Sequence, residues 1–189
     1  NPFYPNPDYL LEISDRIGIK VFGTSAKYIA ELEKLKIQPK KISSFPGLRS
    51  ILSTGSPLSE ESFDYVYKSW KKDVQLSSIS GGTDIISCFA LGNPMLPVYK
   101  GELQSLGLGM KVESFNDNGQ SVIDREGELV CTQAFPSMPI SFWNDDDRSK
   151  YHEAYFDTFE GVWHHGDYIK IFNHGGVKIY GRSDATLNP

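Results

Sequence analysis

Three short apolar segments in the first half of the chain, separated by longer amphipathic segments, constrain the fold most. Residues 19–22, 48–52 and 74–79 have the length and composition of buried strands. Residues 24–35 and 59–70, which lie between them, repeat apolar side chains at helical spacing. Short covered strands that alternate with helices are typical of a parallel sheet with flanking helices. The first half is therefore predicted to form an α/β unit.

Capping residues mark where these helices begin and end. Asn6, followed by proline, predicts the start of a first helix, and Gly18 predicts its end. Thr24 or Ser25 is expected to start the second helix, and Ser59 the third.

The pattern changes from about residue 97 onward, where glycines and turn residues recur every few positions. Short strand candidates lie between these turns, at residues 111–115, 128–132, 168–172 and 177–180. We therefore expect an α/β protein with a partial parallel sheet in residues 1–96, followed by a small antiparallel, β-barrel-like subdomain in residues 97–181.

Composition excludes several classes of protein. The chain has 189 residues, of which 39% are hydrophobic and 13% aromatic, as in a packed globular protein. Its net charge of −5 comes from interspersed charges, which argues against a nucleic-acid partner. No apolar run approaches the ~20 residues that span a bilayer, so no membrane partner is expected. Cys88 and Cys131 predict free thiols in a reducing, cytoplasmic compartment.

A glycine-rich motif, Ser80-Gly81-Gly82-Thr83-Asp84, follows the predicted strand 74–79. Glycines let a backbone approach a ligand closely, a threonine hydroxyl can donate to a phosphate oxygen, and a carboxylate can bind magnesium. Three further segments strengthen the signal: residues 53–58, 163–167 and 181–184. Because ligands gather at the carboxyl ends of parallel strands, these motifs together predict a nucleoside triphosphate site.

Each of these residues also has a plainer interpretation. Asp167 could bind both ribose hydroxyls or cap its own turn, and Arg182 could bind phosphate or form a surface ion pair. Ile179 could cover an adenine ring or belong to the core. Asp84 could hold a metal ion or cap the segment that follows it. The local sequence leaves these alternatives open.

Other polar clusters predict no chemistry. His164 and His165 are adjacent, so on a strand they point to opposite faces and could not easily share a zinc ion. Residues 145–147 are three aspartates without the glycine and distal glutamate of a calcium loop, and we expect a solvated turn there. Ser56 has no evident histidine and aspartate partners, so a serine hydrolase is not supported.

The four motifs, in this order and spacing, resemble the adenylate-forming acyl-coenzyme A synthetases over nearly the whole chain. Several segments resemble most closely the branch that activates acetoacetate: residues 22–27, 51–58, 78–89, 96–102, 142–145 and 181–189. The resemblance implies that acetoacetate reacts with ATP and Mg²⁺ to give an acyl-adenylate, which coenzyme A then converts to the thioester. A ligase for another short acid, such as butyrate or a branched acid, and a non-catalytic nucleotide-binding module are the alternatives.

The resemblance also implies roles for residues. The positions that match the family's nucleotide-binding motifs are Gly55, Ser56, Pro57, Ile79 and Ser80 around the adenine, Asp167 at the ribose, Ile179 beside the base, and Arg182 at ribose or phosphate oxygens. Thr83 and Asp84 are the candidate catalytic residues, because Thr83 would contact the α-phosphate and Asp84 would hold Mg²⁺ where most relatives carry glutamate.

Three further expectations follow from the resemblance. Gly81 replaces a tryptophan of acetyl-specific relatives, so Gly81 and Gly82 are expected to leave room for a longer acid. Asp184 is expected to be the hinge to a C-terminal domain, within a hinge segment at residues 182–189. The chain contains no Ser/Thr/Gly-rich phosphate loop ending in lysine, and it ends at this hinge. The polypeptide alone is therefore expected to lack synthetase activity, which an assay with acetoacetate, ATP and coenzyme A would test.

Overall fold

The computed structural model describes residues 1–183. Contacts between Cα atoms group the chain into two compact units. The α/β unit consists of residues 1–79 and 92–104, and the β unit consists of residues 80–91 and everything described from residue 105 onward. The predicted boundary was a single point after residue 96. The chain instead enters the β unit at residue 80, returns to the α/β unit at residue 92 and enters the β unit again at residue 105.

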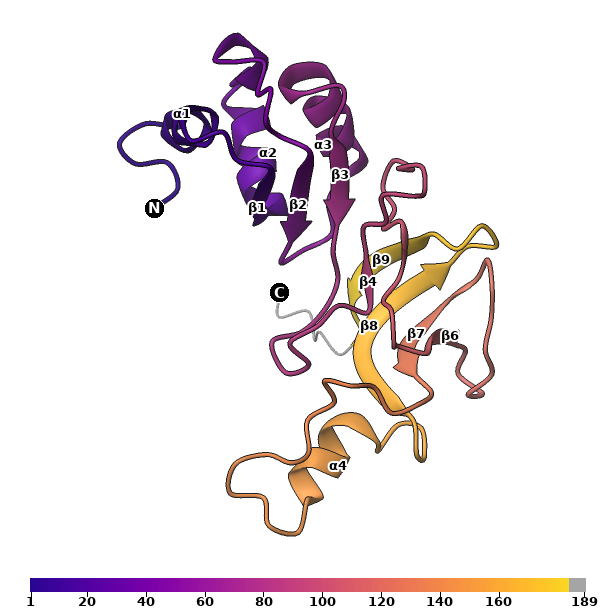
Figure 1. Cartoon of the computed structure of the whole chain (residues 1–189). Coiled ribbons are helices and arrows are strands. Elements are labelled where there is room, and N and C mark those ends of the chain that lie inside the picture. The colour runs from indigo at the N-terminus through magenta and orange to yellow at the C-terminus, as the bar shows by residue number, and fades with distance from the viewer. Residues whose placement is uncertain (184–189) are drawn as a thin grey trace. The chain divides into compact units, whose positions relative to one another are not determined.

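The α/β unit contains a parallel sheet with strand order β1-β2-β3, which Figure 1 shows with α2 and α3 beside it. The strands are β1 (Val21–Ser25), β2 (Ser50–Thr54) and β3 (Gln75–Ser78). The helices are α1 (Tyr9–Arg16), α2 (Ala26–Lys34), the single 3₁₀ turn Pro39–Lys41, and α3 (Glu60–Tyr65), which continues as the π-helical turn Val66–Trp70. The predicted parallel sheet with flanking helices is confirmed.

Two of the predicted helix starts are confirmed and one is wrong. The Ser25 hydroxyl accepts a hydrogen bond from the Tyr28 N–H at 3.1 Å, and the Ser59 hydroxyl accepts one from the Ser62 N–H at 3.3 Å. The Asn6 side chain instead accepts from the N–H of Asp8 at 3.0 Å, and α1 begins only at Tyr9. Asn6 closes a turn ahead of the helix because its amide reaches the N–H two residues on.

The strand predicted at residues 19–22 runs later, over residues 21–25. It extends as far as the capping serine because β1 pairs with β2 along its whole length, ending at Ser25 opposite Thr54. Apolar side chains make up most of the core of the unit, in which Leu11, Ile29, Leu32, Ile51 and Val66 have no exposed surface. Burying each such side chain stabilises the fold by about 1.5–3 kcal/mol.

The β unit contains an antiparallel sheet with strand order β6-β7-β8-β9 and a separate two-stranded pair, β4-β5. The strands are β4 (Ala90–Leu91), β5 (Ser105–Leu106), β6 (Val112–Phe115), β7 (Glu126–Cys131), β8 (Trp163–Ile171) and β9 (Val177–Arg182). The predicted antiparallel architecture is confirmed, and the four-stranded sheet in the described residues is open rather than a closed barrel. Figure 1 shows the long, curved β8 beside β9.

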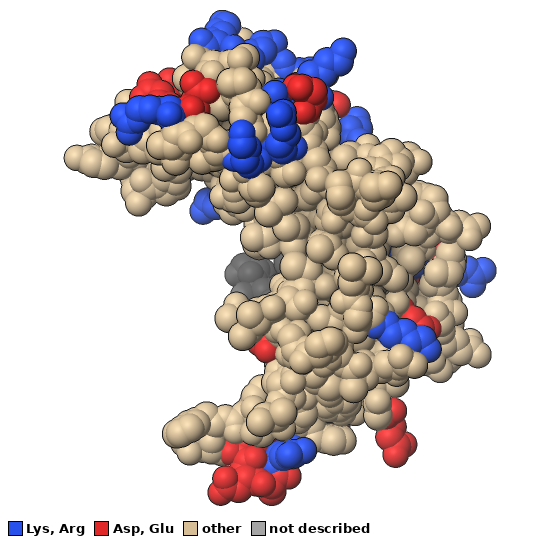
Figure 2. Space-filling model, in the orientation of Figure 1, with Lys and Arg blue, Asp and Glu red and all other residues tan. Residues whose placement is uncertain are grey.

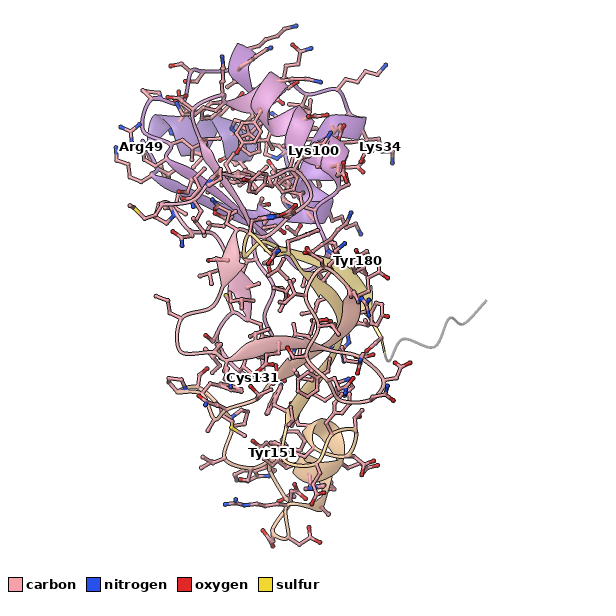
Figure 3. The ribbon with its side chains drawn as sticks, turned by 90° about the vertical axis from the view of Figure 1, so that its right-hand side faces the viewer. Lys34, Arg49, Lys100, Cys131, Tyr151 and Tyr180 are labelled. Carbon is pink, nitrogen blue, oxygen red and sulfur yellow. The ribbon has the colours of Figure 1, made fainter. Side chains whose placement is uncertain are left out.

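A fourth helix, α4 (Ser149–Tyr155), was not predicted, and one of the three aspartates before it is buried. Asp145 is only 5% exposed, and its carboxylate accepts hydrogen bonds from the Lys150 N–H at 3.0 Å and the Tyr151 N–H at 2.8 Å. The predicted solvated turn is therefore wrong for Asp145, because its charge satisfies backbone donors at the start of α4. Figure 3 labels Tyr151, whose ring lies near Trp163.

On the face drawn in Figure 2, basic and acidic side chains lie close to one another over the α/β unit. Within residues 1–183, no helix combines the length and the apolar character needed to cross a bilayer.

Candidate functional site

The glycine-rich motif lies on a loop whose two ends are hydrogen bonded to each other. The Ser80 N–H donates to the Ala90 carbonyl, and the Phe89 N–H donates to the Ser80 carbonyl, both at 2.9 Å. Inside the loop, the Ile86 N–H donates to the Gly82 carbonyl at 3.2 Å. Thr83 and Asp84 are exposed within this closed turn. The sequence motif therefore presents a hydroxyl and a carboxylate on an anchored loop of the β unit.

Gly81 and Gly82, the two glycines of the motif, are closely packed against other residues of the loop, and Gly82 is also close to β8. A Cβ atom at Gly81 would overlap the carbonyl oxygen of Ser87 and lie 2.9 Å from the Cα of Cys88. A Cβ atom at Gly82 would overlap the carboxylate of Asp84 and lie 3.1 Å from Cε1 of His165. Close packing of the loop is thus a reason for glycine at both positions, and their role in an acyl pocket stays a prediction.

The carboxylate of Asp84 has a specific donor in α4. The Tyr155 hydroxyl donates to Oδ2 of Asp84 at 2.8 Å. The Tyr155 ring stacks on the buried Trp163, with ring centroids 3.6 Å apart and planes 14° apart. Burial raises the pKa of Tyr155, and the hydrogen bond to Asp84 raises it further, so the phenol keeps the proton that it donates.

Asp167 and Arg182 are paired across β8 and β9. Nη1 of Arg182 lies 3.7 Å from Oδ1 of Asp167, and it donates to the backbone carbonyl of His165 at 2.8 Å. The Asp167 side chain is 14% exposed, so it is shielded from bulk water but not closed off. Of the two sequence interpretations for Arg182, the ion pair is present, and it holds a cation beside the carboxylate proposed to bind ribose.

His165 is influenced both by Asp84 on the glycine-rich loop and by Asp167 on β8. Its Nε2 atom is 3.9 Å from Oδ2 of Asp167, and its ring makes an edge contact with Phe89 at a centroid distance of 4.6 Å. Burial lowers the pKa of His165, although the negative charges of Asp167 and Asp84 oppose this. The imidazole is therefore neutral near pH 7, and its Nδ1 atom has no hydrogen-bond partner within the described residues.

His164 points to the other face of β8, as the alternation along a strand requires. Its Nε2 atom lies 2.8 Å from the Glu128 carboxylate, which also accepts a hydrogen bond from the Ser183 hydroxyl at 2.6 Å. In the described part of the chain, no three His, Cys, Asp or Glu residues cluster as a metal site of their own.

The β unit thus brings residues from three separate motifs together with one residue that sequence reasoning missed, Tyr155. The residues from the motifs are Asp84, His165, Asp167 and Arg182, and His165 had been considered only as a zinc ligand. Both Asp84 and Asp167 act electrostatically on His165, which links the glycine-rich loop to the β8–β9 hairpin. One feature of the sequence could have indicated Tyr155: it follows Tyr151 by four residues, the spacing that places two side chains on one face of a helix. Nothing in the sequence identified its partner.

The other predicted nucleotide-binding residues lie elsewhere or are less distinctive. Gly55, Ser56 and Pro57 are exposed just after β2 in the α/β unit, and Ile79 follows β3 half-buried. Ser80 and Ile179 are half-buried in the β unit, where Ile179 pairs with Ile169 across β8 and β9. Asp184 lies outside the described residues. The roles of all seven residues remain predictions.

No protein-family model matches the chain. Over its whole length, however, the chain is 54% identical to part of the acetoacetyl-coenzyme A synthetase of Rhizobium meliloti (strain 1021). It is 53% identical, again over its whole length, to part of the acetoacetyl-CoA synthetase of Gallus gallus. The chain is homologous to one segment of acetoacetyl-CoA synthetases. This segment is 29% of the Rhizobium protein and 28% of the Gallus protein.

The structure gives the same relationship. A solved acetoacetyl-CoA synthetase from Streptomyces lividans matches 99% of the chain with a TM-score of 0.90 and 44% sequence identity, over 29% of that protein. The chain therefore spans less than a third of the length of the acetoacetyl-CoA synthetases it matches. The resemblance predicted from the motifs, to the acetoacetate-activating branch, is confirmed.

Proposed function

We propose that the protein containing this chain is an ATP-dependent ligase that joins acetoacetate to coenzyme A. The observation that carries this proposal is the identity of the whole chain with one segment of acetoacetyl-CoA synthetases from a bacterium and an animal, 54% and 53% in the two cases above. The cluster of Asp84, Asp167 and Arg182 in the β unit supports it, because its charges suit a nucleotide with a metal ion.

The proposed reaction has two steps. In the first, a carboxylate oxygen of acetoacetate attacks the α-phosphorus of ATP, the bond from that phosphorus to the bridging oxygen breaks, and pyrophosphate leaves. In the second, the sulfur of coenzyme A attacks the acyl carbon of the adenylate, its thiol proton is lost, and AMP leaves. Positioning and charge neutralisation supply most of the catalysis in such phosphorus chemistry.

In this proposal the β unit holds the ribose and the α-phosphate. The Asp167 carboxylate accepts hydrogen bonds from the ribose hydroxyls, and Arg182, already within 3.7 Å of it, contacts ribose or phosphate oxygens. The hydroxyl of Thr83, on the anchored loop, donates to the α-phosphate. Ile179 flanks the base. From the resemblance alone, we also propose an adenine-binding role for Gly55, Ser56, Pro57, Ile79 and Ser80.

Asp84 is the proposed protein ligand of Mg²⁺. A single exposed carboxylate fits this ion, which proteins commonly bind through one or two carboxylates while substrate phosphates and water complete the shell. The absence of a cluster of three ligands in residues 1–183 is compatible with that mode. When bound, Mg²⁺ would neutralise phosphate charge, and the protein's own part is to hold Asp84 in place.

The test is a pyrophosphate-release assay on the full-length protein with a panel of short acids, in the presence of ATP and coenzyme A. Acetoacetate should be used with the highest kcat/KM. A preference for butyrate or a branched acid would replace the acetoacetate assignment with another short-acid ligase. Absence of turnover with every acid, from protein that still binds ATP, would favour a non-catalytic nucleotide-binding module.

We also propose a cytoplasmic location, supported by Cys88 and Cys131, which are both free thiols. Recovery of the protein with a secreted or membrane fraction after cell fractionation would contradict it.

A further inference from the structure

The hydrogen bond from Tyr155 to Asp84 joins two segments that are 71 residues apart in sequence. It connects the glycine-rich loop with α4, and both belong to the β unit. The donor is held in place by its surroundings: the ring stacks on Trp163 at 3.6 Å and also contacts Phe142, at a centroid distance of 5.7 Å. Trp163 is itself only 1% exposed. The hydroxyl therefore reaches Asp84 from a fixed ring.

Asp84 needs such a partner because it lies on an exposed turn. An exposed carboxylate is free to rotate unless hydrogen bonds or packing restrict it. Here Oδ2 accepts from Tyr155, and Oδ1 lies against Gly82, where a Cβ atom would overlap it. Tyr155 thus restricts one oxygen, and the glycine leaves the space that the other oxygen occupies in this orientation.

We propose that Tyr155 is a positioning residue that orients the Asp84 carboxylate for its cation; this rests on the proposed function of Asp84. A phenol is a suitable partner for this task because it is neutral and donates one hydrogen bond. It leaves the remaining lone pairs of the carboxylate for a metal ion and brings no competing positive charge. Hydrogen-bond partners of metal-binding side chains typically change metal affinity by about 10–100-fold when they are removed.

The experiment measures binding of Mn²⁺, as a paramagnetic substitute for Mg²⁺, by electron paramagnetic resonance. The full-length protein is titrated in the presence of ATP and the absence of acid. Tyr155→Phe keeps the stacked ring and removes only the donor, and we expect about 10-fold weaker Mn²⁺ binding.

Tyr151→Phe is the matched control. It removes a hydroxyl from the same helix, one that donates to the Pro139 carbonyl at 2.6 Å, and it keeps a ring that also contacts Trp163. Its Mn²⁺ binding should equal that of the unmodified protein. In an Asp84→Ala background, Tyr155→Phe should weaken binding no further, because its only route to the metal is removed.

Three outcomes would overturn the proposal. Unchanged Mn²⁺ binding in Tyr155→Phe, while Asp84→Ala weakens it, would remove the role of Tyr155 and leave that of Asp84 intact. Equal losses in Tyr155→Phe and Tyr151→Phe would show that packing of α4, not the hydrogen bond, matters. Unchanged binding in Asp84→Ala would overturn both this inference and the proposed metal ligand.

Discussion

Asp167 and Arg182 face each other across β8 and β9, with Nη1 of the guanidinium 3.7 Å from Oδ1 of the carboxylate. The same nitrogen donates to the His165 carbonyl at 2.8 Å, so the backbone of β8 fixes the cation beside the anion. A ligand that approaches Asp167 therefore meets an acceptor and a donor whose relative positions are already set. This preorganisation suits a ribose, whose paired hydroxyls can use both.

Removing the carboxylate should impair the use of ATP and spare the fold. In the full-length protein we expect Asp167→Ala to raise the KM for ATP by about 10–100-fold, because hydrogen bonds to a charged group contribute about 1.5–3 kcal/mol each. Arg182 keeps its bond to the His165 carbonyl, so the hairpin should stay folded. Pyrophosphate exchange at varied ATP concentration measures this. Asp117→Ala, at an exposed turn, is the control, and an unaltered KM in Asp167→Ala would refute the ribose assignment.

His165 should make the stability of the protein depend on pH. Burial lowers its pKa below the ordinary value of about 6.5, so the unfolded chain takes up a proton in a range where the folded chain does not. The lowered pKa of His165 leaves the free energy of unfolding unchanged above about pH 6.5 and reduces it increasingly as the pH falls below that value.

The melting temperature of the chain should accordingly fall between about pH 7.5 and pH 5.5, and fall less in His165→Gln, which cannot take up the proton. Thermal unfolding followed by tryptophan fluorescence gives both values. His152→Gln, at an exposed position of α4, is the control, and its melting temperature should fall as much as that of the unmodified chain. An equal decline in His165→Gln would show that other groups carry the pH dependence.

Gly81→Ala should destabilise the β unit. The added Cβ atom would overlap the Ser87 carbonyl and approach the Cα of Cys88 to 2.9 Å, and both are backbone atoms that cannot rotate away. Overpacking of this kind costs about 1–3 kcal/mol. Gly23→Ala is the control for added volume, since nothing lies within 4 Å of its Cβ position. Urea unfolding compares the two, and a Gly81→Ala protein as stable as Gly23→Ala would mean that the loop can yield.

Much of the fold could be predicted because local sequence carried the signal. Strand 74–79 and the caps Ser25 and Ser59 depend on neighbouring residues only, and the structure has them close to where the sequence placed them. Asp145 could not be identified in this way. Three successive aspartates have the composition of a solvated turn. The N–H groups that donate hydrogen bonds to the buried Asp145 carboxylate lie five and six residues further along, on α4.

The sequence also predicted some of the residues that the structure brings together in the candidate site, whose roles remain proposals. Asp167 and Arg182 each belong to a recognisable motif, and a hairpin brings the two motifs together. Tyr155 belongs to no motif that was singled out, and its partner Asp84 is 71 residues away. A hydrogen bond over that separation depends on how α4 packs on β8, which no local pattern specifies.

Asp145 offers a test of how far the folding of α4 supports this site. Asp145→Ala would leave the N–H groups of Lys150 and Tyr151 without their acceptors, which were 3.0 and 2.8 Å away. Lys150 is exposed, so water can reach its N–H, whereas the Tyr151 N–H is buried and costs about 1–3 kcal/mol when it is left unpaired. We therefore expect a loss of about 1–3 kcal/mol in the free energy of unfolding. Asp146→Ala, the exposed neighbour, should change it by less than about 0.5 kcal/mol. Urea unfolding of the two variants decides the matter. If Asp145→Ala is as stable as Asp146→Ala, the buried carboxylate does not anchor α4, and its other contacts, such as the stacking of Tyr155 on Trp163, must hold the helix.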